Sequence, residues 1–130
     1  MDNRVFIFGE SEKGELCTPT LFLTLAELAE KMGNPNPESK GINSAVQMLL
    51  SQYPIIFYRV REEGYSKEDY LRGVKLLYKE SSSMNLSAIC LPGVGDAEII
   101  NPLTPICKKN SLLMILSEED LYDYLTGLKY

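Results

Sequence analysis

Four short apolar runs alternate with longer amphipathic stretches along this chain. The runs are Arg4–Phe8, Ile55–Arg61, Leu86–Leu91 and Leu112–Leu116. Continuous apolar runs of this length, bounded by glycine, proline or polar residues, are typical of strands that are buried on both faces of a sheet. Strands that alternate with helices predict a mainly parallel sheet, because parallel neighbours need a long crossover between them.

The stretch between the first two runs predicts two helices. Thr18 is a suitable N-cap, and Pro19 suits the first helical position because its missing N–H is not needed there. Apolar residues at spacings of three and four follow as far as a stop at Gly33. A second helix is expected from Asn36 and Pro37 to about Gln52. The apolar face of the first helix would consist of Leu21, Leu25, Leu28 and Met32.

Three further helices are expected in the second half of the chain. One begins at Ser66, which with Asp69 three positions later approximates a capping box, and it closes over residues 79–83. The last helix begins at Ser117 and ends at Gly127. Its first turn is acidic, which the helix dipole favours.

The remaining helix is expected to start at Asp96. Pro102 and Pro105 follow within ten residues. A proline inside a helix removes a backbone donor and clashes with the preceding turn. We therefore expect these prolines to kink this helix or split it in two.

These elements predict a single α/β domain over residues 1–130. The expected architecture is a small three-layer α/β/α sandwich with a four-stranded, mostly parallel sheet, Rossmann-like or flavodoxin-like in type. With the strands numbered along the chain, the expected order is 2-1-3-4 with right-handed crossovers. A chain of 130 residues buries enough surface to fold without a metal or disulfide.

Composition and charge exclude several classes of partner. The formal net charge is -5, from 13 basic and 18 acidic residues. Without a basic cluster such a chain repels phosphate backbones, so we expect no nucleic-acid partner. The apolar runs are too short for a bilayer, so we expect no membrane association. Cys17, Cys90 and Cys107 have no paired spacing, and no secretory signal is evident, which together indicate a cytoplasmic location.

The sequence contains no histidine. It therefore lacks the usual general base near neutral pH and the commonest metal ligand. Nucleophile pairs of the Ser–His or Cys–His kind are excluded, and three scattered cysteines cannot close a zinc site. Acidic residues such as Glu118 and Glu119 are interpreted as complements of the helix dipole rather than as magnesium ligands, so no metal site is predicted.

The strongest indication of a binding site is the turn after the third apolar run. Gly93 and Gly95 stand in this turn, and Asp96 then begins a helix. A glycine turn that leads into a helix exposes backbone N–H groups, which suit a phosphate or carboxylate. Asp96 opposes this function, because its carboxylate would compete for the same N–H groups. The alternative is that the glycines serve only a tight turn.

In sheets of this kind, ligands bind beyond the carboxyl ends of the strands, where the winding reverses. The expected strand order puts Glu10 and Ser11 at this point, facing the glycine turn. Ser11 would supply a hydrogen bond and Arg59 a positive charge, unless Arg59 pairs with nearby glutamates at the surface. The predicted binding residues are Glu10, Ser11, Arg59, Gly93, Gly95 and Asp96.

We therefore expect a small α/β domain that binds a nucleotide or another anionic metabolite at the carboxyl edge of its sheet. No cofactor can be named, and whether the protein is an enzyme stays open, because the residues form no evident pair of nucleophile and base. The alternative is a non-enzymatic interaction or scaffold domain without a small-molecule ligand. The C-terminal helix, with Tyr122, Tyr124 and Tyr130, is then the expected contact of a homo-oligomer.

Overall fold

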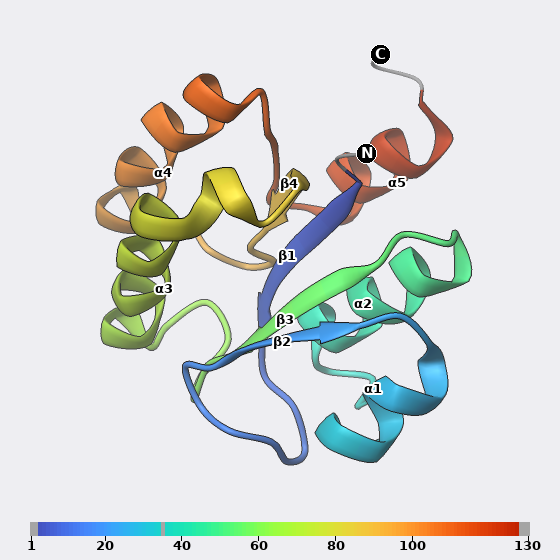
Figure 1. The fold of residues 1–130 in the computed structure, drawn as a ribbon. Helices are drawn as coiled ribbons and strands as arrows, with labels where there is room; N and C mark the ends of the chain where they lie inside the picture. Colours follow the sequence, from blue (N-terminus) through green and yellow to red (C-terminus); the bar gives the residue numbers. More distant parts are fainter. Residues whose placement is uncertain (1–2, 35, 128–130) are drawn as a thin grey trace.

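Helices cover both faces of one sheet in this protein (Figure 1). The computed structural model describes residues 3–34 and 36–127. Within these residues, no helix combines the length and the apolar character that crossing a bilayer requires. The elements are β1 (Arg4–Gly9), β2 (Pro19–Phe22), α1 (Leu25–Met32), α2 (Lys40–Leu50), β3 (Ile55–Arg59), α3 (Lys67–Glu80), a 3-10 turn η1 (Ser81–Ser83), β4 (Leu86–Cys90), α4 (Ala97–Asn110), β5 (Leu113–Ile115) and α5 (Glu118–Thr126).

The prediction of an α/β fold is confirmed, but the sheet differs from the one expected. Its order is β2-β3-β1-β4-β5, with five strands in the described part of the chain. β3, β1, β4 and β5 pair in parallel, whereas β2 pairs antiparallel with β3. The four predicted strands are therefore present, in the predicted order. The prediction of a four-stranded, mostly parallel sheet is wrong, because β2 makes the sheet five-stranded and mixed.

β2 occupies residues that the leucine spacing assigned to the first helix. Leu21 lies opposite Ile56 of β3, and Phe22 is buried against the sheet's helical cover. The helix starts only after Thr24, whose hydroxyl accepts from the N–H of Glu27 at 3.2 Å. The carboxylate of Glu27 accepts from the N–H of Thr24 in return, at 3.1 Å. This capping box places the helix start at Thr24 and not at Thr18. The backbone groups of Pro19–Phe22 pair with β3 instead of joining the helix.

Two other helix starts differ from the prediction. α2 is capped by Ser39, whose hydroxyl accepts from the N–H of Ile42 at 3.3 Å, and not by Asn36. Ser66 does precede α3, but its side chain makes no cap bond. The predicted capping box does not form, because the carboxylate of Asp69 binds groups outside the helix. These contacts are described below.

α4 runs unbroken from Ala97 to Asn110 with Pro102 and Pro105 inside it. The expected split does not occur. The carbonyls that lose a donor to these prolines belong to Glu98 and Asn101, which are both exposed, so water can hydrate them. The buried stripe Ile99, Leu103, Ile106 and Cys107 holds the helix against the sheet.

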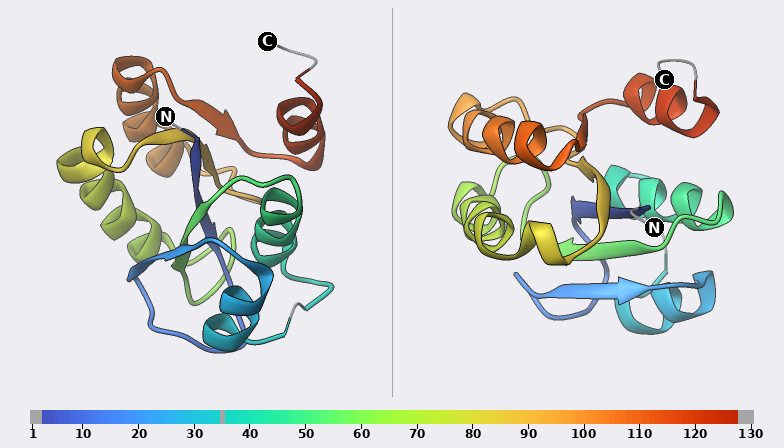
Figure 2. Two further views of the ribbon diagram at one scale, coloured as in Figure 1. Left: turned by 45° about the vertical axis from the view of Figure 1, so that its right-hand side comes forward. Right: turned by 45° about the horizontal axis from the view of Figure 1, so that its top comes forward.

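The core lies in two halves, one on each face of the sheet. α3 and α4 cover one face, and α1, α2 and α5 cover the other (Figure 2). The centre of the first half is aromatic: the rings of Phe8 and Tyr58 have centroids 5.0 Å apart, and Tyr70 stacks on Phe8 at 5.3 Å. Cys90 is fully buried in the second half.

We expect the substitution Gly73→Ala to destabilise the protein. Alanine is normally better than glycine in a helix, by about 1 kcal/mol. Here, however, a Cβ would collide with the ring of Phe8, including its Cζ at 2.8 Å. Overpacking of this kind costs about 1–3 kcal/mol, so it should outweigh the gain in helix propensity. Urea denaturation measures the effect. Gly95→Ala is the matched control, since a Cβ there meets no atom within 4 Å; equal stability of the two variants would contradict the packing.

Candidate functional site

The predicted binding residues lie at or just beyond one edge of the sheet. β1, β3, β4 and β5 run parallel, so their carboxyl ends share this edge. Glu10 and Ser11 follow β1, Arg59 ends β3, and the glycine turn follows β4. The edge therefore exists, but the structure does not bring all of these residues together.

A loop after β3 stands between Glu10 and the glycine turn. The backbone N–H of Glu63 donates to the Glu10 carboxylate at 2.9 Å. A Cβ on Gly64, the next residue, would lie 2.8 Å from the carbonyl oxygen of Gly93. Glu10 therefore faces this loop and not Gly93 and Gly95, and the hydroxyl of Ser11 donates to the carbonyl of Lys13 at 2.8 Å, so the expected approach of both residues to the glycine turn is not seen.

Arg59 supports the chain's own loop between β1 and β2. Its Nη1 donates to the carbonyl of Gly14, and its carbonyl accepts from the N–H of Cys17 at 2.9 Å. Its Nε is buried without a hydrogen-bond partner. The ion pairs among the described residues are Arg61 with Asp69 and Lys67 with Glu98, so the expected surface pairing of Arg59 with glutamates is not seen.

The N-terminus of α2 already holds a carboxylate, that of Glu63. Its two oxygens accept from the backbone N–H groups of Lys40 and Gly41, both at 2.9 Å, and from that of Glu10 at 3.2 Å. The hydroxyl of Ser39 is 3.3 Å away. An external phosphate or carboxylate would seek the same donors at a helix N-terminus. Glu63 therefore occupies the position of a bound anion.

Two of the other helices that begin at this edge, α4 and α5, carry their own acceptors as well. At α4, the Asp96 carboxylate accepts from the N–H of Glu98 at 2.8 Å, as predicted for an N-cap. At α5, the hydroxyl of Ser117 accepts from the N–H of Asp120 at 3.1 Å, and the Asp120 carboxylate accepts from the N–H of Leu116 at 3.1 Å. An anion that approached either helix would meet a carboxylate first.

The two glycines of the turn have different roles. Gly93 has a φ of 78°, which residues with a Cβ rarely adopt, so the turn itself requires glycine at this position. Gly95 has no positive φ, and a Cβ added to it meets nothing within 4 Å. The structure thus supports the tight-turn interpretation for Gly93 and leaves open space at Gly95.

A cleft lies beside this edge, on the face that α2 and α5 cover, with a volume of about 970 Å³. One wall is α2, the opposite wall is α5, and the glycine turn closes one end. Of the predicted binding residues, Gly93 alone lines it. Its apolar lining is Pro37, Pro92, Ile115, Leu116, Leu121, Tyr122 and Leu125, its charged lining is Glu38, Lys40, Glu118 and Glu119, and its other lining residues include Asn43, Ser44, Gln47 and Cys90.

Sequence reasoning missed this cleft because its walls come from helices about seventy residues apart. One local signal was present. Asn43, Ser44 and Gln47 lie beside the apolar stripe of α2, and polar residues that border a buried stripe can mark a hollow next to it.

A second, smaller hollow of about 330 Å³ lies at the start of α2. The predicted residues Glu10 and Ser11 line it, together with Glu12, Asn34, Asn36, Ser39 and Ile42. In the part of the chain that the structure describes, no three acidic, cysteine or histidine side chains form a group that could hold a metal ion.

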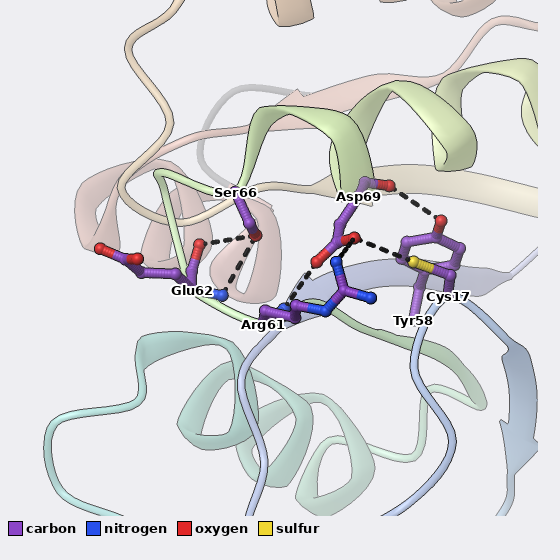
Figure 3. Close-up of polar contacts among 6 residues, drawn as sticks. All are labelled: Cys17, Tyr58, Arg61, Glu62, Ser66 and Asp69. Atoms are coloured by element: carbon purple, nitrogen blue, oxygen red, sulfur yellow. Dashed lines mark hydrogen bonds and ion pairs between the residues drawn. The ribbon is translucent and has the colours of Figure 1, made fainter.

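A buried carboxylate, that of Asp69, fixes the loop that carries Glu63 (Figure 3). Its side chain is 1% exposed and accepts from the backbone N–H of Arg61 at 2.9 Å. The thiol of Cys17 donates to it at 3.4 Å, and the Arg61 guanidinium lies 3.5 Å away. The hydroxyl of Tyr58 donates to the Asp69 carbonyl at 2.8 Å. These bonds join α3 to the ends of β3 and of the loop before β2.

Burial alone would raise the pKa of Asp69. The hydrogen bond from the Arg61 backbone, the Cys17 thiol and the charge of Arg61 outweigh it, so the pKa of Asp69 is lowered. Burial raises the pKa of the Cys90 thiol to about 12 and also raises that of Cys107. Both thiols stay protonated near neutral pH and are poor nucleophiles.

Comparison with protein-family models, with curated proteins and with solved structures finds no match to this chain. Its function therefore has to be inferred from the geometry and the charges of the hollows described above. The cleft between α2 and α5 is the larger of these two and the more apolar in its lining.

We expect Glu63→Ala to lower the free energy of unfolding by about 2 kcal/mol, because hydrogen bonds to a charged group contribute about 1.5–3 kcal/mol. Chemical denaturation at neutral pH measures this loss. Glu62→Ala is the control, since Glu62 is exposed and its hydrogen bonds to Ser66 use only its backbone. A stability of Glu63→Ala equal to that of the control would contradict the capping role.

We expect Asp69→Asn to destabilise the protein in a pH-dependent way. Because the folded-state pKa of Asp69 is lowered, its carboxylate stabilises the fold fully above the unfolded pKa of about 4 and loses this effect as the pH falls through the folded value. The difference in unfolding free energy between wild type and variant should therefore be constant from about pH 7 to pH 5 and shrink below about pH 4. Denaturation curves across this range give the result; a difference that grows toward acid would refute the assignment.

Proposed function

We propose that this protein binds a small molecule in the cleft between α2, the β4–α4 turn and α5. The volume of about 970 Å³ supports this proposal, since ligand pockets commonly measure about 300–1,000 Å³. The position supports it too. β1 and β4 are neighbours from which the winding proceeds in opposite directions, and ligands of open α/β sheets bind at the carboxyl edge near this point.

The order of the parallel strands is a further support. Counted along the chain without β2, the strands β3, β1, β4 and β5 have the order 2-1-3-4, which is the beginning of the flavodoxin-like order 2-1-3-4-5. A Rossmann-like or flavodoxin-like type is therefore part of this proposal.

We also propose a cytoplasmic location. The three free thiols, Cys17, Cys90 and Cys107, support it, because thiols stay reduced in that compartment.

The lining indicates the chemistry of the ligand. Leu121, Tyr122 and Leu125 offer an apolar wall, while Glu38, Glu118 and Glu119 outnumber Lys40. This balance favours a ligand with an apolar or aromatic body and a neutral or positively charged polar group. The nucleotide or other anionic metabolite expected from the sequence stays a prediction. It would have to bind through Lys40 and the backbone of the glycine turn.

Thermal denaturation with a panel of compounds tests the proposal. A ligand that binds only the native state stabilises it by RT ln(1 + [L]/Kd), so Tm rises with the logarithm of the ligand concentration once this exceeds Kd. We expect shifts from aromatic or alkyl amines and from neutral aromatic compounds, and smaller shifts from nucleotides and phosphorylated metabolites. The variant Gln47→Trp fills the cleft from its α2 wall and should abolish the shifts, because Gln47 lines the cleft and is exposed.

Lys75→Trp is the matched control for Gln47→Trp. It introduces the same side chain at an exposed position of α3, which covers the opposite face of the sheet. Shifts that survive in Lys75→Trp and vanish in Gln47→Trp place the ligand in the cleft. Absence of any shift across the panel, or equal shifts in both variants, would refute the proposal. A response to anionic compounds alone would favour the chemistry expected from the sequence.

The second candidate function is a non-enzymatic interaction or scaffold domain that forms homo-oligomers through its C-terminal helix. Tyr122 of α5 is exposed, which favours it. Tyr124 does not, because it is buried and its hydroxyl lies 2.5 Å from that of Ser87. Tyr130 lies outside the described residues. Light scattering after size exclusion distinguishes the candidates: this one requires an oligomer that Tyr122→Ser disrupts, with no response to small molecules.

A further inference from the structure

β2 is an edge strand, and exposed leucines lie in it and directly after it. It pairs with β3 on one side and ends the sheet on the other. Leu21 is 42% exposed, Leu23 60% and Leu25 40%, although Phe22 between them is buried in the core. These three leucines, spaced by two residues, are here called the β2 leucines. Nearly half of the large apolar side chains that are exposed among the described residues therefore lie within five positions of the chain.

This edge lacks the protection that edge strands usually carry. Natural edges are blocked by charged side chains, especially lysine, by proline, or by a covering element. From Leu16 to Ala26 the chain has no charged residue. Pro19 blocks only the first position of β2. The nearest following acid, Glu27, is turned back onto the chain, since its carboxylate accepts from the N–H groups of Leu23 and Thr24 at 2.9 and 3.1 Å.

The opposite edge of the sheet is different. β5 has three residues, Leu113–Ile115, and Ile115 is buried. The acidic start of α5, with Glu118, Glu119 and Asp120, follows at once. A short edge beside three carboxylates repels an identical edge. An approach of two chains is therefore easier at β2.

We propose that β2 is the contact at which two copies of this chain associate, with the two strands antiparallel about a twofold axis. The net charge of -5 makes two copies repel each other over most of their surface. The uncharged edge is where this repulsion is weakest. A twofold contact is self-complementary, so the leucines of one copy meet those of the other, and the two five-stranded sheets join through backbone hydrogen bonds. This contact is separate from the cleft and independent of its ligand.

Sedimentation equilibrium of the whole chain, from about 1 μM to about 1 mM, covers the range of weak and moderate dimers. We expect a reversible monomer–dimer equilibrium for the wild type. Leu23→Lys adds a positive charge to this contact in each copy, and because the two like charges repel each other it should raise the dimer Kd at least about tenfold. Leu21→Lys is a second variant of the same kind. Because both side chains are largely exposed, thermal melts should show that the variants fold like the wild type.

Tyr65→Lys is the matched control. Tyr65 is 76% exposed, more than either leucine, and lies in the loop after the carboxyl end of β3, whereas Leu23 follows the end of β2 that pairs with the start of β3. We expect its Kd to stay within about twofold of the wild type. Hydrogen exchange is a second measurement: the amides of β2 should become more protected as the protein concentration rises, and those of β5 should not.

Three results would overturn this proposal. The chain could be a monomer at every concentration, or Tyr65→Lys could weaken association as much as Leu23→Lys, which would indicate non-specific hydrophobic contact. An oligomer that resists both leucine variants but is lost in Tyr122→Ser would assign the interface to α5 instead.

Discussion

The rest of this structure depends on the parallel alignment of β3, β1, β4 and β5, because it brings the starts of several helices to a single edge. Each helix start has backbone N–H groups without partners inside the helix. At three of the helices that begin at this edge the chain supplies a side-chain partner itself: Glu63 at α2, Asp96 at α4, and Ser117 at α5. A ligand that approached these three helices would have to bind beside these groups and not in their place.

The loop 60–66 is the clearest case of this self-sufficiency. Asp69, buried at the start of α3, holds the loop through Arg61, and the loop in turn delivers the carboxylate of Glu63 to α2. The same loop separates Glu10 from Gly93. One buried carboxylate thus helps to hold the loop that caps α2 and keeps Glu10 apart from the glycine turn.

Much of the fold could be predicted from local patterns. The four apolar runs became strands because residues buried on both faces leave an uninterrupted signal, and the caps at Asp96 and Ser117 depend on atoms only two or three residues away. β2 could not be predicted in this way. Its leucines satisfy helical spacing and strand alternation equally, and only the pairing with β3, more than thirty residues later, decides between them. The position of Glu63 depends on contacts of comparable range, so its place at the start of α2 was not visible in the sequence.

The attachment of α5 sets the width of the cleft. Among the residues of this helix, all of them described, Tyr124 is the buried one; its ring lies 5.3 Å from that of Tyr53, and its hydroxyl reaches Ser87. Leu121 and Leu125 are partly buried against the same half of the core, whereas α2 places five buried residues there. The wall that α5 forms is therefore held to the sheet by fewer buried side chains than the wall that α2 forms, so a substitution at Tyr124 would change the shape of the cleft more than a substitution at any single residue of α2.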